Sequence, residues 1–413
     1  MNVQGGSGAA AARGLSPRLL ANAPHRLMFA IGAANVLLAM LWWAAWLVDI
    51  RWQFPGLRQP VVYAGWLHAI VMQYQVLAPF MFGFLLTVFP RWMGQQELTR
   101  WHYVPVGVGL FGGQLLTLGG ALGPPHLLHL GALLTIAGWA TGLFYLLRWL
   151  WRDQARTWHA LSCGAAMLLG FAGFLAYAVF LHDADARLVL AAIKIGSFGL
   201  LLPVYFTVAH RMFPFFAGHV VPGYRPWRAM WVLGAFWPLV LAHLVLELAH
   251  ASGWLWVPDA LLLALSATWL VRNWPRGGGP LLAKVLFWGY AWLPVALALY
   301  CVQSLLYLSG GDYLLGRAPA HAMFIGFFGS LLVAMVTRVT QGHSGRPLVF
   351  GGLAMFAFVV IQLVTVVRVV AELVPDQMAW QAAAAIGWVL AFLPWVLRSL
   401  GIYLSPRADG RPG

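Results

Sequence analysis

Charged residues are scarce in this chain. Only 9% of its 413 residues are Asp, Glu, Lys or Arg, whereas 62% are hydrophobic, and the mean hydropathy is +0.78. A water-soluble domain cannot hide so large a fraction of apolar side chains, because polar residues must cover much of its outside. The composition therefore excludes a soluble fold and indicates an integral membrane protein with the lipid bilayer as its surroundings.

Cysteine is almost absent too. Cys163 and Cys301 stand alone in apolar runs with no C-x-x-C spacing, which excludes a disulfide framework and a thiolate metal cluster. Acidic residues are few, so the net charge is +14. Arginines that flank membrane helices are the ordinary cause of such a charge, and it gives no reason to expect a nucleic-acid partner.

Long apolar runs dominate what is present. A bilayer core of about 30 Å needs roughly 20 apolar residues per helix. Alternating polarity, which the strands of a membrane barrel would show, is missing. The sequence predicts an all-α polytopic membrane protein with about twelve transmembrane helices in one bundle. The predicted helices are 27–48, 62–89, 104–121, 127–147, 159–180, 188–209, 228–248, 254–272, 283–308, 321–340, 349–371 and 379–402.

The ends of the chain and its basic residues set the expected orientation. Residues 1–24 lack the apolar core of a signal peptide and are predicted to be a disordered tail. The helical domain is 25–403, and 404–413 form a second tail. Placing both tails in the cytoplasm puts 19 basic residues inside and five outside, with Lys194 left within a helix. This asymmetry predicts cytoplasmic termini and an even number of helices.

A weak internal period follows the arginines. Arg91, Arg211 and Arg338 close the second, sixth and tenth predicted helices in "VFPRWMG", "VAHRMFPFF" and "MVTRVTQG". Three groups of four helices would produce this spacing, and so would the positive-inside bias alone. Pro79, Pro203 and Pro294 lie inside three predicted helices. Each proline leaves a backbone carbonyl without its helical partner and can bend the helix, in some cases around a cavity.

Histidines inside apolar runs are the main candidates for chemistry, because an ionisable group in the bilayer is costly and needs a reason. His68 lies about 10 Å inside the second helix at the helical rise. His321 opens the tenth helix, and His243 lies in the outer half of the seventh. Imidazoles on different helices suit a b-type haem or copper. Packing between helices is the alternative for each of them.

Several neighbours of these histidines fit a cofactor. Gly326 and Gly329 follow His321 and would leave room for a flat macrocycle, or would let helices pack closely. Gln75, two turns after His68, is a candidate hydrogen-bond partner for that histidine. Lys194 could reach the outer surface or neutralise a buried carboxylate such as a haem propionate, and Glu247 is its one plausible protein partner.

Four segments resemble one known family. "HAMFIGFFGSLLVAMVTRVTQGHSGRPL" (321–348) is similar to the closing signature of the NnrS family, membrane proteins of nitric oxide metabolism described as containing haem and copper. "HRMFPFF" (210–216), "WLHAIVMQYQVLAPFMFGFLLTVFPRWMG" (66–94) and "APHRLMFAIGA" (23–33) resemble its other segments in the same order. The residues carried over are His68, Arg211, Pro214, His321, Arg338, His343 and Arg346.

One segment departs from the family. The family's second helix has H-x-H-E-M, whereas this chain has His68, Ala69, Ile70, Val71 and Met72. The second histidine and the glutamate are therefore missing, and haem is expected in preference to copper. At the end of helix 10, we expect His343 and Arg346 to cap the helix and Arg338 to reach its neighbours. That cluster would fix the bundle or bind an anion, with no metal at His343.

The resemblance implies a role in nitric oxide tolerance, nitrosative stress and denitrification in a bacterial inner membrane. Nitric oxide or a derived species would then be a partner; no reaction is implied. A haem–copper oxidase site is excluded, because the chain has no His-His pair and no histidine followed four residues later by tyrosine. The alternative is a transporter for a small anion or a metal complex, favoured by Lys194, the broken helices and the arginine-rich cytoplasmic end.

Overall fold

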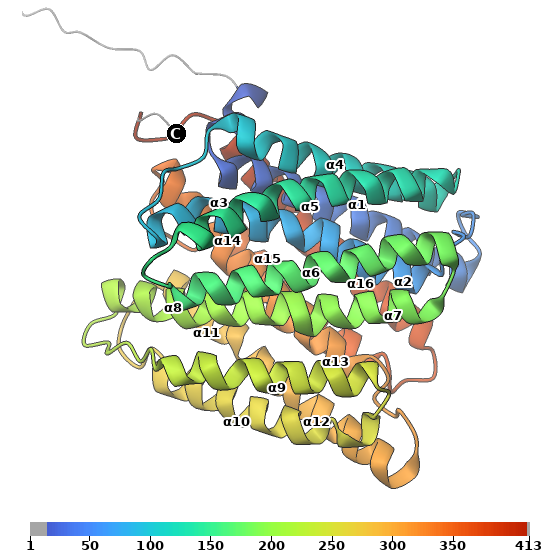
Figure 1. The fold of residues 1–413 in the computed structure, drawn as a ribbon. Coiled ribbons are helices and arrows are strands. Elements are labelled where there is room, and N and C mark those ends of the chain that lie inside the picture. Colours follow the sequence, from blue (N-terminus) through green and yellow to red (C-terminus); the bar gives the residue numbers. More distant parts are fainter. Residues whose placement is uncertain (1–14, 411–413) are drawn as a thin grey trace, which may run out of the picture.

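Twelve long helices make up one bundle in the computed structural model, which describes residues 15–410 (Figure 1). No strand occurs in that range, so the all-α prediction is confirmed. Each of the twelve predicted apolar runs coincides with one observed span. The observed spans are Pro24–Trp52, Ala64–Trp92, Arg100–Leu122, His126–Arg152, Trp158–Asp183, Ala186–Val220, Met230–Leu248, Ser252–Asn273, Leu281–Gly310, Ala318–Ser344, Gly352–Val370 and Gln377–Tyr403.

Seven spans are single α-helices, and an eighth adds one short 3₁₀ turn. The single helices are α1 (Pro24–Trp52), α4 (Arg100–Leu122), α5 (His126–Arg152), α6 (Trp158–Asp183), α9 (Met230–Leu248), α15 (Gly352–Val370) and α16 (Gln377–Tyr403). The eighth span joins η4 (Ser252–Trp254) to α10 (Trp256–Asn273), and η1 (Pro17–Asn22) is a 3₁₀ helix that precedes α1.

The other four spans are interrupted. The second consists of α2 (Ala64–Val71), η2 (Met72–Val76) and α3 (Leu77–Trp92), and the sixth of α7 (Ala186–Lys194), η3 (Ile195–Leu201) and α8 (Leu202–Val220). The ninth breaks between α11 (Leu281–Tyr290) and α12 (Trp292–Gly310). The tenth consists of α13 (Ala318–His321), η5 (Ala322–Gly329) and α14 (Ser330–Ser344).

The two ends of the described chain meet on one side of the bundle. The backbone N–H of Ser16 donates to the carbonyl of Leu404 at 2.8 Å, and the Tyr103 hydroxyl donates to Ala21. The tail expected over 1–24 is thus ordered from residue 15, while residues 1–14 lie outside the described range. Adjacent ends require an even number of crossings, in agreement with twelve.

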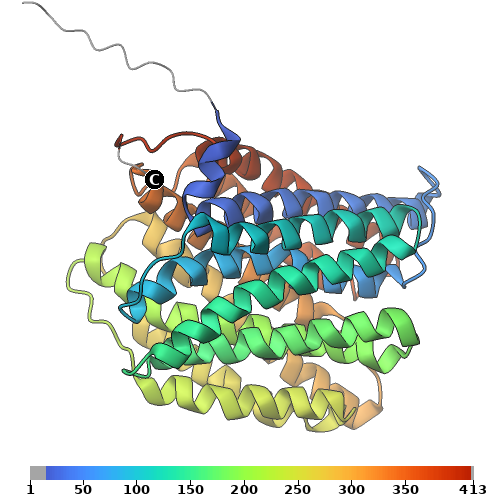
Figure 2. The same ribbon diagram turned by 45° about the horizontal axis from the view of Figure 1, so that its top comes forward.

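The helices form three groups of four around a common centre. The last helix of each group packs on the first of the next: α5 on α6, α10 on α12 and α16 on α1, the last contact closing the ring (Figure 2). The second span of each group runs through the middle, in the same direction in all three cases, with α2, α7 and α13 at one end and α3, α8 and α14 at the other (Figure 1). This arrangement favours the threefold interpretation of the arginine period.

Each of these three central spans contains a π-helical segment: η2, η3 and η5. Pro79 and Pro203 follow the first two within three residues, as expected where a proline removes an N–H and its ring presses on the preceding turn. The third proline, Pro294, follows the break at Ala291. No proline follows η5, so nothing comparable in the sequence marks the longest of these segments.

A carbonyl freed by proline finds a partner on the neighbouring helix. Pro79 cannot donate to the carbonyl of Gln75, and the buried Asn35 side-chain amide on α1 donates to it instead at 2.7 Å. The Trp139 indole donates to the adjacent carbonyl of Tyr74 at 3.1 Å. Inside a bilayer an unpaired carbonyl is costly, so these bonds hold the interrupted helix in place.

This bond yields a stability prediction. Asn35→Leu should lower the free energy of unfolding by about 1–3 kcal/mol, because it leaves a buried carbonyl unpaired. In a Pro79→Ala background the restored N–H of residue 79 can reach that carbonyl, and the same leucine substitution should cost less. Unfolding of all four proteins in mixed detergent micelles gives the coupling energy. Equal costs in both backgrounds would contradict this account of the carbonyl.

The arrangement of the helices also predicts which loops lie on each side of the membrane. Green fluorescent protein fused after Gly413 should fluoresce, since the described ends lie on the side expected in the cytoplasm. Alkaline phosphatase fused after Gly311, in the turn that follows α12, should be active, because that turn lies at the opposite end. Fusion after Arg276, between α10 and α11, is the inactive control. Phosphatase activity at both Gly413 and Gly311 would overturn the twelve-span arrangement.

Candidate functional site

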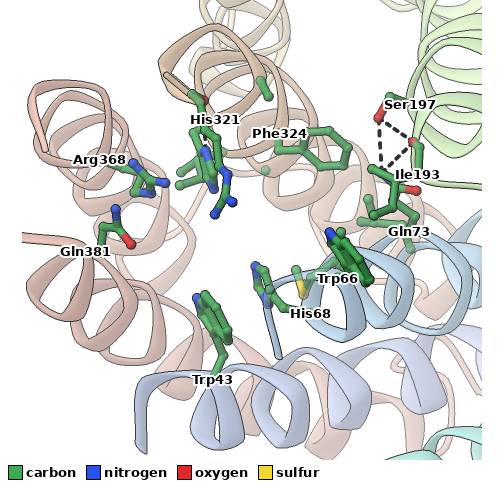
Figure 3. Close-up of a pocket in the computed structure, with 18 of the residues that line it drawn as sticks. Trp43, Trp66, His68, Gln73, Ile193, Ser197, His321, Phe324, Arg368 and Gln381 are labelled. Carbon is green, nitrogen blue, oxygen red and sulfur yellow. Dashed lines mark hydrogen bonds between the residues drawn. The ribbon is translucent and has the colours of Figure 1, made fainter. Parts of the chain in front are cut away.

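A cavity of about 300 Å³ lies between the central spans on the side away from the chain ends. His68, on α2, and His321, at the end of α13, point into it from opposite walls (Figure 3). We call it the outer cavity. The two histidines that the sequence selected from distant helices are thus brought to one space.

His321 is held in one tautomer. Its Nδ1 lies 2.9 Å from the carbonyl oxygen of Arg317, one turn earlier, and must therefore donate to it. The lone pair is left on Nε2. A histidine whose Nδ1 is fixed by a carbonyl presents Nε2 as a ligand atom, which is the usual state of metal-bound imidazoles.

His68 is oriented by stacking. Its ring lies on the Trp43 indole of α1, with the ring centres 4.2 Å apart and the planes 11° from parallel. Trp43 in turn stacks on Trp46 at 5.1 Å. The imidazole has no hydrogen-bond partner among the described residues, so both its nitrogens are available to whatever enters the cavity. No sequence pattern distinguishes Trp43 from the other tryptophans.

Two arginines stand beside His321 in the lining. Arg368 of α15 is buried and forms an ion pair at 2.6 Å with Glu372, which lies four residues later in the turn that follows this helix. Arg317 is exposed at the start of α13, and its side chain has no partner within residues 15–410. From the sequence, both count only among the five basic residues expected on the outer side. The i, i+4 spacing of Arg368 and Glu372 was the available signal for the buried pair.

The π-helical turns change which residues face the cavity. Gln75 was expected near His68, but it donates to Thr117 and Thr135 hydroxyls on α4 and α5, each at 2.9 Å, and does not line the cavity. The extra residue in η2 rotates the helix after His68, and Gln73 occupies the lining instead. The Gln73 amide donates to Ser197 Oγ at 3.0 Å and to the Ile193 carbonyl at 3.2 Å (Figure 3).

The two glycines after His321 have different roles. A Cβ at Gly326 would lie 2.6 Å from the ring of Trp292, so this glycine serves packing against α12. Gly329 lines the cavity, where a Cβ would lie 3.2 Å from the Trp388 ring. Only Gly329 therefore contributes space to the outer cavity.

A chain of ionisable groups adjoins the outer cavity. Lys194 Nζ lies 2.7 Å from Glu247 Oε1, which is the pairing expected from the sequence, and both residues line the cavity. His243 does not line it. It is fully buried against Phe198, and its Nδ1 lies 2.6 Å from Asp259 on α10. The Glu247 carboxylate thus neutralises Lys194, and His243 lies behind the residues that line the cavity.

The arginines expected at the other end of the bundle do gather there. Arg338 lies over the Phe216 ring of α8 at 4.1 Å, which is the expected reach towards a neighbouring helix. The predicted capping role is wrong, however: α14 ends at Ser344 and is capped by Gly345, with φ +68, and the backbone N–H groups of Gly345 and Arg346 donate to the Gln341 carbonyl. His343 instead packs on His25, with ring centres 4.2 Å apart.

Arg346 follows α14 outside the membrane-spanning segments. Partial burial, with the nearby Arg398 charge, lowers the pKa of its guanidinium from the usual value. One of its terminal nitrogens is buried without a partner among the described residues.

The donor set limits which metal site can be built. No group of three or more His, Cys, Asp or Glu side chains that could hold a metal ion occurs within residues 15–410. The outer cavity offers two imidazoles, His68 and His321, which would suffice to hold a b-type haem. A copper ion with only protein ligands would need further donors.

Comparison with known proteins identifies the family of the chain. No curated protein matches the chain. The family described as NnrS protein matches residues 19–407, which include all twelve spans and both cavity histidines. The chain therefore belongs to the NnrS family.

Proposed function

We propose that this chain is a haem-binding inner-membrane protein that acts in the bacterial response to nitric oxide and nitrosative stress. Family membership supports a membrane protein linked to nitric oxide. One observation carries the haem assignment: imidazoles from two distant spans, His68 and His321, face each other across one cavity.

The remaining lining fits a flat, amphipathic macrocycle. Trp43, Trp66, Phe324 and Trp388 supply broad apolar faces between the histidines. Arg317 can pair with a propionate carboxylate, because its guanidinium has no partner within the described range. Arg368 adds a second positive charge, although Glu372 already offsets part of it. Lys194 is less suited to this role than the sequence suggested, since Glu247 neutralises it.

A haem held by His68 and His321 would supply one-electron chemistry and an iron that binds diatomic molecules. The protein holds the two imidazoles differently. His321 is fixed by its bond to the Arg317 carbonyl. His68 is held only by stacking on Trp43. Of the two imidazoles, that of His68 is therefore the less firmly held.

The spectrum of the purified protein tests this proposal. Protein expressed with ample haem should show a Soret band, and His68→Ala or His321→Ala should lose most of the bound haem or shift the band to a five-coordinate position. His182→Ala is the matched control, because His182 is exposed at the end of α6 and lies outside the cavity. An unchanged spectrum in both cavity variants would end the assignment, and colourless wild-type protein containing copper would favour copper instead.

The transporter alternative needs a path through the bundle. Between the outer cavity and the arginine-rich end lies a small space of about 70 Å³, lined by aromatic and aliphatic side chains including Phe29, Phe80, Phe84 and Phe213. Moving an ion through such a layer is costly, because nothing in it replaces the lost water. A neutral gas has no such penalty. This layer favours the haem proposal over anion transport.

The cellular role predicts a growth phenotype. Bacteria that lack this gene should recover more slowly than their parent after a pulse of a nitric oxide donor. The wild-type gene and His182→Ala should restore recovery, whereas His68→Ala should not. Growth curves with matched membrane levels of each protein measure this. Full complementation by His68→Ala would separate the cellular role from the haem site.

A further inference from the structure

A second, larger cavity of about 600 Å³ lies at the opposite end of the central spans. Four arginines line it: Arg91 of α3, Arg211 of α8, Arg228 in the segment before α9, and Arg338 of α14. His343 lines it as well, and no Asp or Glu does. We call it the basic cavity. The three arginines that mark the internal period of the sequence thus meet in one space.

The charges of this cavity are mostly unbalanced. Arg91 forms an ion pair with the exposed Glu97 at 3.2 Å. Arg228 and Arg338 have no ion pair or side-chain hydrogen bond with any residue in the described range. The Nε of Arg338 is buried without a partner. Three guanidinium groups are therefore left without a carboxylate, which favours an anionic ligand.

Arg211 is held in position by a hydrogen-bonded chain. Its Nη1 donates to His159 Nδ1 at 3.4 Å, His159 Nε2 donates to His210 Nδ1 at 3.0 Å, and His210 Nε2 donates to the Ala229 carbonyl at 3.2 Å. The guanidinium also lies over the Trp92 ring at 4.4 Å. This sequence of donors fixes both imidazoles in a neutral tautomer and leaves the remaining N–H groups of Arg211 free for a ligand.

Membrane orientation alone does not explain this geometry. Arginines that only mark the cytoplasmic side would spread towards lipid headgroups around the outside of the bundle. Arg211 and Arg338 belong to central spans, and their side chains line a space between those spans. Rings of Trp92 and Phe216 support their flat faces, which leaves the guanidinium edges to bind an oxyanion.

We propose that the basic cavity binds a phosphate-like oxyanion, either free phosphate or the phosphate of an anionic lipid headgroup. Guanidinium groups bind phosphate oxygens with two parallel hydrogen bonds each, which suits this set of side chains. The apolar space that contains Phe84 and Val339 borders the basic cavity and separates it from the outer one. The site is therefore independent of haem and of the proposed function.

Titration with inorganic phosphate tests the proposal. The protein is purified in an uncharged detergent, and calorimetry follows phosphate binding at constant ionic strength with chloride as the reference anion. Wild-type protein should bind phosphate saturably. Arg338→Gln and Arg211→Gln should each weaken binding at least about tenfold, as loss of a charge-assisted hydrogen bond does. Arg338→Lys, which keeps the charge but loses the planar fork, should lie between.

Arg148→Gln provides the matched control. Arg148 is exposed on α5 outside the cavity, so its removal changes the net charge equally and should leave binding unchanged. Equal weakening by this variant would overturn the site, as would saturable binding unaffected by Arg338→Gln. Far-ultraviolet circular dichroism and the melting temperature without phosphate identify any variant that fails to fold, and Arg338→Lys then carries the test.

A lipid arm distinguishes the two sources of phosphate. The protein is reconstituted in vesicles of phosphatidylcholine with or without phosphatidylglycerol, and native mass spectrometry counts retained lipid. Retention of phosphatidylglycerol by wild type but not by Arg338→Gln, without binding of free phosphate, assigns the cavity to a lipid headgroup. Binding of free phosphate assigns it to a soluble anion. If neither free phosphate nor phosphatidylglycerol binds, the proposal is refuted.

Discussion

The absence of water inside a bilayer is the constraint on which this structure depends. Every backbone N–H and carbonyl in that region must find a partner within the protein. Nine of the twelve spans meet the requirement without π-helical turns. The three central spans contain π-helical turns and are also well enclosed by other helices. In these spans 89%, 61% and 72% of the most apolar stretch is buried. Irregular backbone is placed where neighbouring helices can supply the missing bonds, as Asn35 and Trp139 do.

That placement explains both the strength and the limit of sequence-based prediction here. Number, order and approximate ends of the helices follow from the length of apolar runs, which the bilayer fixes. His68 and His321 could be selected because an ionisable side chain within an apolar run is energetically costly and therefore indicates a functional site. The pairing of Lys194 with Glu247 could be anticipated from similar depth in the bilayer and the shortage of other acidic partners.

What could not be predicted depends on helical phase. Face assignments assume 3.6 residues per turn, and a π-helical turn breaks that assumption. Gln75 was therefore placed beside His68, whereas Gln73 lines the cavity. Arg368 and Trp43 were missed for another reason, since contacts between the first, second, tenth and eleventh spans depend on the ring of helices. The residue pattern within one helix does not indicate which distant helix packs against it.

The common direction of the three central spans has an electrostatic consequence. Peptide dipoles add along each span and place roughly half a positive charge at its N-terminus and half a negative charge at its C-terminus. All three spans begin with α2, α7 and α13, which contribute to the lining of the outer cavity, and end with α3, α8 and α14, which contribute to the lining of the basic cavity. The aligned dipoles therefore make the outer cavity a favourable place for an added electron, and they offset part of the arginine charge at the other end.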